Sequence, residues 1–281
     1  MADIMCEVNP EYRKFIRNMN GKKILYVRVI RSIYGCIEAA LLWYKLYKDT
    51  LEKEGFKLNP YEMCVANKEI NGHQCTIAWY VDDNKVSHKD PLLVTNIFNL
   101  VESKFGKLTV IKGNRHEYLG MDIKLGNKRF EISMKQQILE AIKMFGEELT
   151  GAVTSPCARH LLEVREEVNQ LDEKRKEMFH SVTAKLFYIE TRSRPDIETA
   201  VSFLTTRVDR SDEDDWKKLW RVLQFLRQTI EDVRVIGCES MDSLFTWIDA
   251  AYGVWTNMRS QTEGCMSLGL GMIHCKSCKQ S

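Results

Sequence analysis

Two adjacent carboxylates, Asp82 and Asp83, are the residues of this sequence best suited to chemistry. They follow Tyr80-Val81 and precede Asn84, in a run of residues that favour a turn. Two carboxylates on a tight turn repel each other unless a divalent cation neutralises them. Mg²⁺ is the natural candidate, because it is a hard ion bound by carboxylate and phosphate oxygens. A pair of such ions about 3.5–4 Å apart holds the attacking and leaving oxygens in phosphoryl transfer.

The same residues also have an ordinary structural explanation. Asp-Asp-Asn is a common composition for a solvated turn, so these residues alone do not establish a site. Whether they do chemistry depends on the elements that position them and on the rest of the chain.

Two hairpins are predicted to present the carboxylates. Residues 64–70 and 75–81 are the first two strands, the second of them rich in β-branched and aromatic residues, and Asn71-Gly72 between them is a strong hairpin signal. Residues 85–87 form the third strand, so Asp82 and Asp83 lie at the tip of the second hairpin. Ahead of them, a helix is predicted from Ser32 to about Glu54, packed beside the hairpins.

The remaining chain alternates between helical and strand patterns. Strands are expected at residues 23–30, 118–125, 129–134, 233–236, 244–248 and 265–270. Helices are expected from Pro91 to about Lys104, over 135–145, within 181–208 and from Ser211 onward, with a solvated helix or connector at 163–176.

Composition excludes several classes of protein. The 281 residues are 44% hydrophobic and 28% charged, which suffices for a sizeable core. The formal net charge is only +2, so any nucleic-acid binding must use a local basic stripe. There is no run of about 18 apolar residues, so no membrane span is expected. Nine Cys without framework spacing and an N-terminus unlike a signal peptide favour an intracellular protein, cytoplasmic or nuclear and not secreted.

An ordered series of segments resembles the Pol polyprotein of copia-type (pseudovirus) LTR retrotransposons. The segments are residues 32–44, Gly55-Phe56, Tyr80–Asp83, residues 116–123, Thr154–Pro156, Leu186–Tyr188 with Arg194–Ile197, Trp216 with residues 221–227, Trp247–Asp249, Arg259-Ser260 and residues 276–280. Their order covers nearly the whole chain, which makes the resemblance specific.

The resemblance implies an α+β fold with a reverse-transcriptase palm-like sheet and packed helices. It implies a palm and primer-grip region over residues 1–150, a helical thumb and connection over 151–230, and a truncated ribonuclease H-like α/β unit over 231–281. The implied activity is RNA-directed DNA polymerisation, with an RNA or DNA primer–template and dNTPs as partners and Mg²⁺ as the metal.

The resemblance also implies roles for individual residues. Asp82 and Asp83 match the palm metal carboxylates, and Tyr80 and Val81 would line the primer terminus and the template-strand side. Asp249 matches the first metal carboxylate of ribonuclease H. The matched primer-grip residues are Tyr118, Leu119 and Gly120.

A local basic stripe is expected around the third hairpin. Residues 101–145 hold nine Lys+Arg against five Asp+Glu. By resemblance this region would meet primer phosphates, whereas the residues alone are equally compatible with a mixed surface. The residues concerned are Lys112, Arg115, Lys124, Lys128 and Arg129.

The sequence departs from the family pattern at its metal ligands. The family has a further palm Asp on a strand before the Tyr34-Gly35 segment, whereas Asp3 is the only Asp there. Further ribonuclease H carboxylates would follow Ser281, and Glu38 and Glu263 replace the usual Gln and Gly. We therefore expect an incomplete, inactive polymerase fragment. The alternatives are an inert nucleic-acid-binding remnant and, last, a two-metal hydrolase, for which the usual His and Asp clusters are lacking.

Three other features are expected to be structural. Cys275 and Cys278 have zinc-ligand spacing but no second pair, so chance is the better explanation. Trp216 and Trp220 share a helical stripe with leucines and are expected in the core rather than stacked on bases. The acidic residues 212–215 fit a helix N-terminus better than a metal site.

Overall fold

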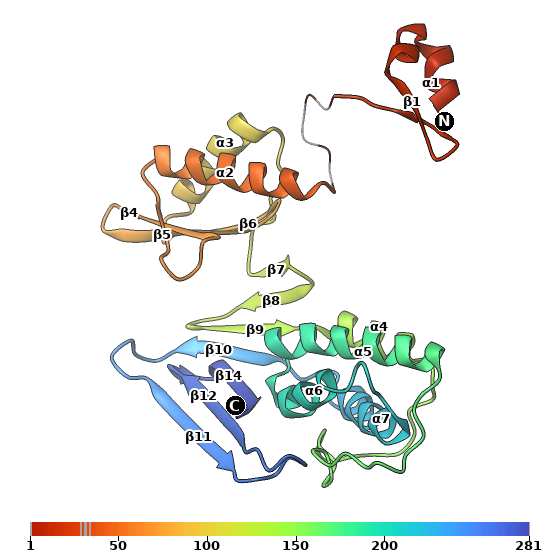
Figure 1. Cartoon of the computed structure of the whole chain (residues 1–281). Helices are drawn as coiled ribbons and strands as arrows, with labels where there is room; N and C mark the ends of the chain where they lie inside the picture. Colours follow the sequence, from red (N-terminus) through yellow and green to blue (C-terminus); the bar gives the residue numbers. More distant parts are fainter. Residues whose placement is uncertain (1, 29, 31–32, 34, 281) are drawn as a thin grey trace. The chain divides into compact units, whose positions relative to one another are not determined.

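The computed structural model describes residues 2–28, 30, 33 and 35–280. These divide into two compact units, Met1–Thr109 and Val110–Ser281. Both units combine helices with antiparallel sheets, which confirms the predicted α+β class (Figure 1).

The N-terminal segment is a small helical and hairpin unit. Helix α1 (Ala2–Val8) and the 3₁₀ helix η1 (Pro10–Phe15) precede strands β1 (Ile16–Met19) and β2 (Lys22–Leu25). The strand predicted over residues 23–30 is too long at its end. Its partner β1 has only four residues, so the pairing stops where Ile16 lies opposite Leu25.

Helix α2 (Ile37–Lys53) is shorter at its start than predicted. Cys36 occupies the N-cap position, and the proposed cap Ser32 lies outside the described residues, as does Tyr34. The helix ends as expected, because Gly55 adopts a φ of +84° that favours glycine.

A four-stranded antiparallel sheet follows α2, in the order β3-β4-β5-β6. Its strands are β3 (Lys57–Leu58), β4 (Val65–Ile70), β5 (His73–Tyr80) and β6 (Asp83–Ser87), and helix α3 (Pro91–Phe105) comes next. The two consecutive hairpins predicted from the sequence are therefore confirmed.

One face of this sheet packs against α2 and α3 (Figure 1). Cys75, Ile77 and Trp79 alternate along β5 as buried residues, at the period of two expected for a strand. They form one core with Tyr47 of α2 and Val101 of α3, and Val86 of β6, opposite Ile77, packs against the same core. The opposite face of the sheet carries the alternate residues of β5 and β6.

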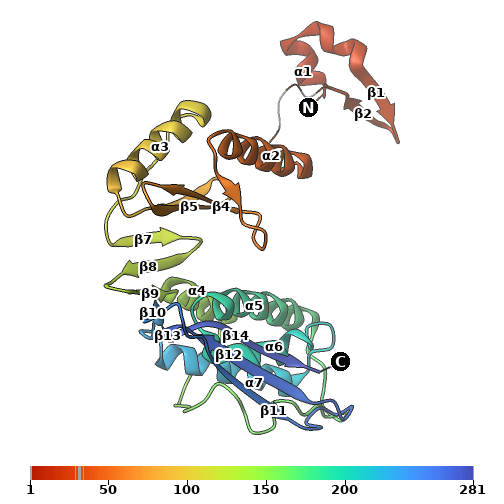
Figure 2. The ribbon, with the colours of Figure 1, turned by 90° about the vertical axis from the view of Figure 1, so that its left-hand side faces the viewer.

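The second unit contains a five-stranded sheet in the order β13-β10-β9-β8-β7 (Figure 2). Its strands are β7 (Arg115–Tyr118), β8 (Met121–Leu125), β9 (Arg129–Ser133), β10 (Arg234–Cys238) and β13 (Gly269–Leu270). The predicted hairpin of residues 118–134 is confirmed, but its first strand begins only at Met121. The preceding residues form the separate strand β7.

Four helices and one 3₁₀ turn pack into the core of this unit. They are α4 (Lys135–Phe145), α5 (Glu173–Arg192), η2 (Pro195–Ile197), α6 (Glu198–Thr205) and α7 (Glu213–Gln228). Trp216 is 6% exposed and stacks on Phe145, and Trp220 packs against the same core, as predicted. The charge-dense residues 163–172 are a connector, since α5 begins at Glu173.

A three-stranded sheet completes the unit, in the order β11-β12-β14. It comprises β11 (Phe245–Ala251), β12 (Gln261–Ser267) and β14 (Met272–Lys279). Before it, β10 pairs with β9, with Arg234 opposite Ile132. The proposed boundary near residue 230 thus falls between α7 and a strand of the five-stranded sheet.

A candidate carboxylate hairpin and candidate nucleic-acid-binding turns

The carboxylates lie at the tip of the β5–β6 hairpin. Tyr80 pairs with Asp83, which leaves Val81 and Asp82 as a two-residue turn, and both aspartates are exposed. Val81 has a φ of +54°. A β-branched residue is a genuine outlier in this left-handed region, and such strain gathers at functional sites.

Side chains on either side hold this strained turn in place. The indole nitrogen Nε1 of Trp43 on α2 donates to the carbonyl oxygen of Val81 at 2.6 Å. The Trp43 ring itself packs edge-on against Phe105, with centroids 5.1 Å apart. Asn84 Nδ2 donates to the Asp82 carbonyl at 2.9 Å. The tip is therefore fastened to α2 as well as to its own strands.

Strand alternation sorts the tip residues onto one face of the sheet. Tyr80 lies opposite Asp83 and Ala78 lies opposite Lys85, so these four share the face turned away from the helices. Tyr80 is 59% exposed. Burial lowers the pKa of the half-buried Lys85 amine. Sequence reasoning missed Lys85, although a period of two from Asp83 indicates it.

Two carboxylates on one turn fit a single Mg²⁺ ion that keeps most of its waters. Among the described residues, no three His, Cys, Asp or Glu side chains lie together as a metal site. The residues outside the description carry no carboxylate side chain: Met1, Val29, Arg31, Ser32, Tyr34 and Ser281. Asp3, the earlier aspartate, lies in α1 and pairs with Lys23 at 2.8 Å.

The predicted primer-grip residues form the β7–β8 turn of the second unit. Tyr118 lies opposite Met121, with Leu119 and Gly120 as the turn at φ values of +50° and +69°. The Tyr188 hydroxyl on α5 donates to the Leu119 carbonyl at 2.7 Å. The Arg192 guanidinium lies 3.7 Å from the centre of the Tyr188 ring. Sequence reasoning missed Tyr188 in this role.

The predicted basic residues around this hairpin differ in their partners. Arg115 forms a bidentate pair with Asp122, whose pKa it holds below the usual range. Lys124 pairs with Glu131 at 3.2 Å. Lys112 and Lys128 are exposed. The basic stripe is therefore partly neutralised within the protein, by exposed pairs of small energetic value.

Asp249 is exposed on β11, directly opposite Glu263 of β12. Its Oδ1 accepts from the backbone N–H of Ala250 at 2.8 Å. The Glu263 carboxylate accepts from Thr199 Oγ1 at 2.6 Å and from Ser277 Oγ at 3.1 Å. Facing like charges destabilise a strand pair, so these contacts to Glu263 offset some of the repulsion.

Cys275 and Cys278 are three residues apart on one strand, β14. Side chains at this spacing point to opposite faces, so the two thiols do not converge on one metal ion. This agrees with the prediction that their zinc-like spacing arises by chance. Likewise, Asp212 caps α7 in a capping box with Asp215, as the helix-start prediction required.

Comparison with known protein families identifies the chain. The model of the reverse transcriptase (RNA-dependent DNA polymerase) family matches residues 10–159, more than half of the sequence. The chain belongs to this family. The match includes the hairpin of Asp82 and Asp83 and the β7–β8 turn.

Similar curated proteins agree with the reverse transcriptase family. The Retrovirus-related Pol polyprotein from transposon TNT 1-94 of Nicotiana tabacum is 23% identical over 77% of this chain, and that from transposon RE2 of Arabidopsis thaliana is 22% identical over 84%. The Putative transposon Ty5-1 protein YCL074W of Saccharomyces cerevisiae is 25% identical over 85% of this chain. The predicted resemblance to copia-type retrotransposon Pol polyproteins is confirmed.

The aligned region covers different shares of these relatives. It spans 17% of the tobacco polyprotein and 16% of the Arabidopsis one, against 77% of the yeast protein. No solved structure matches the chain. Over its described residues, the chain has no helix both long and apolar enough to cross a membrane.

Proposed function

We propose that residues 64–87 are the palm hairpins of a retrotransposon reverse transcriptase, with Asp82 and Asp83 binding Mg²⁺ beside a primer terminus. The observation that carries this proposal is the strained Val81-Asp82 turn, fastened to α2 by Trp43, which presents two exposed carboxylates. A fixed backbone suits a metal site, because positioned ligands lose little entropy when the ion binds.

The neighbouring residues then acquire roles on the open face of the sheet. Tyr80 and Val81 contact the primer terminus and the template strand. Lys85, on the same face, lies near the negative charge of Asp83 and of an incoming phosphate.

The second unit contributes its own nucleic-acid contacts in this proposal. The turn of Tyr118, Leu119 and Gly120 brings the backbone close to the primer. Gly120 has no side chain, which permits that approach. Phosphates are contacted by the basic residues Lys112, Arg115, Lys124 and Lys128.

We assign the domains by family on the same basis. Residues 1–150 form the palm and primer-grip region, 151–230 the thumb and connection, and 231–281 part of a ribonuclease H-like domain with Asp249 as a metal ligand. The exposed position of Asp249 within β11 supports its availability to an ion.

We further infer that this 281-residue chain by itself binds primer–template without extending it. Two carboxylates from one turn hold one ion, whereas phosphoryl transfer through two metals needs ligands on both sides of the ion pair. Loss of one electrostatic contact in catalysis commonly costs about 10²–10³ in rate, and loss of a metal costs at least that. The chain is then a nucleic-acid-binding module of polymerase origin.

Photocrosslinking tests the proposed primer contact. A primer–template with a photoreactive base at the primer 3′ end should crosslink to the peptide containing Tyr80–Asn84. A matched primer with the same base placed about ten nucleotides upstream should not label this peptide. Equal labelling from both positions, or labelling confined to other peptides, would refute the assignment.

A further inference from the structure

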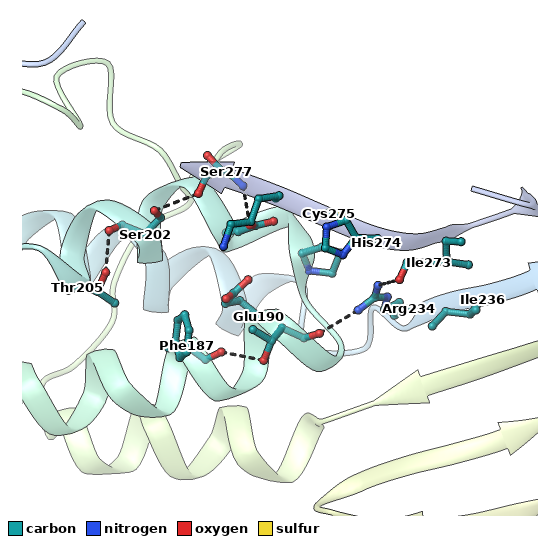
Figure 3. Close-up of a pocket in the computed structure, with 14 residues that line it drawn as sticks. Phe187, Glu190, Ser202, Thr205, Arg234, Ile236, Ile273, His274, Cys275 and Ser277 are labelled. Carbon is teal, nitrogen blue, oxygen red and sulfur yellow. Dashed lines mark hydrogen bonds between the residues drawn. The ribbon is translucent and has the colours of Figure 1, made fainter. Parts of the chain in front are cut away.

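A cavity of about 400 Å³ lies in the second unit, and residues of that unit alone line it (Figure 3). Helices α5 and α6 form one wall, and strands β10 and β14 form the other. Its lining combines apolar side chains with two carboxylates. The apolar members are Phe187, Pro195, Ile236 and Ile273, and the carboxylates are Glu190 and Glu198.

Glu190 is the unusual member of this lining. It is only 5% exposed, and it extends from α5 toward β14 (Figure 3). Among the residues that the structure describes, none hydrogen-bonds to its carboxylate or forms an ion pair with it. A buried carboxylate without a partner is costly, so a ligand that supplies one would be stabilised here.

The second carboxylate, that of Glu198, accepts fewer hydrogen bonds than its two oxygens can. Glu198 Oε1 accepts from the backbone N–H of Ser277 at 2.6 Å, whereas no described residue donates a hydrogen bond to its other carboxylate oxygen. Burial and the nearby Glu198 charge together raise the pKa of Glu190 to about 7. A positive charge placed between the two carboxylates would offset this repulsion.

The resident cations do not pair directly with these carboxylates. Arg234 donates to the backbone carbonyls of Thr191 and Arg192, and also to those of Met272 and Ile273. Lys276 is exposed, and within the described part of the chain it forms no direct ion pair. Its charge therefore acts on the two carboxylates from a distance.

We propose that this cavity binds a small organic ammonium ion, with the nitrogen between Glu190 and Glu198 and the aliphatic chain along Phe187 and Ile273. An ammonium group has three donors, which matches the open acceptors of the two carboxylates. The apolar walls favour a carbon chain, and the volume exceeds the need of a single metal ion. A divalent cation fits less well, since no three His, Cys, Asp or Glu side chains of the described residues come together there as metal ligands.

Isothermal titration with n-butylammonium chloride tests the proposal on the full chain. At pH 8 we expect saturable binding of one ion per chain, and no binding of n-butanol, which lacks the charge. Glu190→Gln should weaken binding at least tenfold. Glu177→Gln removes an exposed carboxylate from the same helix and should change the affinity less than twofold. Circular dichroism of each variant verifies that it is folded.

The pH dependence of the unaltered chain gives a test that needs no variant. Affinity should fall at least tenfold from pH 8 to pH 5.5, because Glu190 becomes protonated through its pKa of about 7. The other charged or titratable groups that face the same space are Glu198, Glu263, His274, Lys276 and Arg234. Lys276 and Arg234 carry their positive charges over this whole range. Burial raises the pKa of Glu198, and its protonation also weakens cation binding.

Several results would overturn the proposal. One is the absence of saturable butylammonium binding. Another is a loss of affinity in Glu177→Gln equal to that in Glu190→Gln. A third is an affinity that stays constant between pH 5.5 and 8. Titration with MgCl₂ alone is the remaining arm: Mg²⁺ binding that Glu190→Gln abolishes, without butylammonium binding, would identify a metal site instead. None of these outcomes depends on primer binding, so the proposal stands or falls separately from the polymerase assignment.

Discussion

Val81 shows how a single residue reports on function at the carboxylate hairpin. Its φ of +54° is unfavourable for a β-branched side chain, yet it is held there by the Trp43 hydrogen bond to its carbonyl. A turn chosen for stability would use Gly or Asn, as Asn71-Gly72 does in the adjacent hairpin. We therefore interpret the Val81 side chain as retained for a contact that it makes rather than for the stability of the fold.

Val81→Gly is expected to leave the free energy of unfolding unchanged or to raise it, by up to about 1 kcal/mol, because glycine adopts positive φ freely. Urea unfolding followed by tryptophan fluorescence measures this. Val65→Gly, in the ordinary extended backbone of β4, is the matched control and should lose about 1 kcal/mol. A comparable loss in both variants would show that Val81 is not strained.

Tyr188→Phe tests the second anchor. Removal of the hydroxyl leaves the Leu119 carbonyl without its donor, at a cost of about 1 kcal/mol that falls locally on the β7–β8 turn. Hydrogen exchange by mass spectrometry should show faster exchange in a peptide covering residues 115–125. Tyr252→Phe, at a position 91% exposed, should leave that peptide unchanged. If both variants exchange like the parent, the bond does not hold the turn.

The sequence predicts some site residues and not others for a physical reason. Asp82 and Asp83 are local signals, since turn composition and flanking strands locate them. Trp43 acts through a contact 38 positions away along the chain, and Tyr188 through a contact 69 positions away. Glu190 is notable for its burial. All three features depend on tertiary packing. Periodicity marks such residues only as interior, without their partners.

At the scale of elements, local turn and cap chemistry explains what could be predicted. The Asn71-Gly72 hairpin, the Pro91 helix start and the helix start at the acidic residues 212–215 all form as expected. Strand β7 was missed, because its turn is Leu119-Gly120, and leucine is not a turn signal. The pairing of β10 with β9 joins strands about a hundred residues apart, for which no local pattern exists.

The cap of α7 should be among the strongest in the second unit. The Asp212 side chain accepts from the backbone N–H groups of Asp214 and Asp215, and it pairs with Arg207 at 3.0 Å. We expect Asp212→Ala to lower the free energy of unfolding by about 2 kcal/mol.

Asp212→Asn isolates the charge from the cap, since Asn is an equally good cap residue, and should lose about half as much. Asp209→Ala, at an exposed position outside the helix, is the control and should change stability by less than about 0.5 kcal/mol. Equal stability of all three variants in thermal unfolding would contradict the role given to the cap.

At the scale of the whole molecule, the near balance of 41 basic and 39 acidic residues limits nucleic-acid binding to local contacts. Several basic residues are also paired with carboxylates, as Arg115 and Lys124 are. Binding to primer–template should therefore be modest and should weaken steeply with salt.

Lys128→Glu should weaken primer–template binding at least threefold in fluorescence anisotropy at 50 mM salt, because Lys128 is exposed beside the β8–β9 turn. Lys174→Glu makes the same charge change at an exposed position in α5 and should have less than half that effect. Matching losses in the two variants would mean that binding follows net charge rather than a local stripe.

Paramagnetic broadening by Mn²⁺, a substitute for Mg²⁺, tests most directly whether the carboxylate hairpin binds a divalent cation. In amide spectra of the full chain, the signals of Tyr80–Asn84 should broaden at the lowest Mn²⁺ concentrations. Asp82→Asn should abolish this broadening while the rest of the spectrum stays unchanged. Hairpin signals that remain sharp while others broaden, or that broaden equally in Asp82→Asn, would contradict the account.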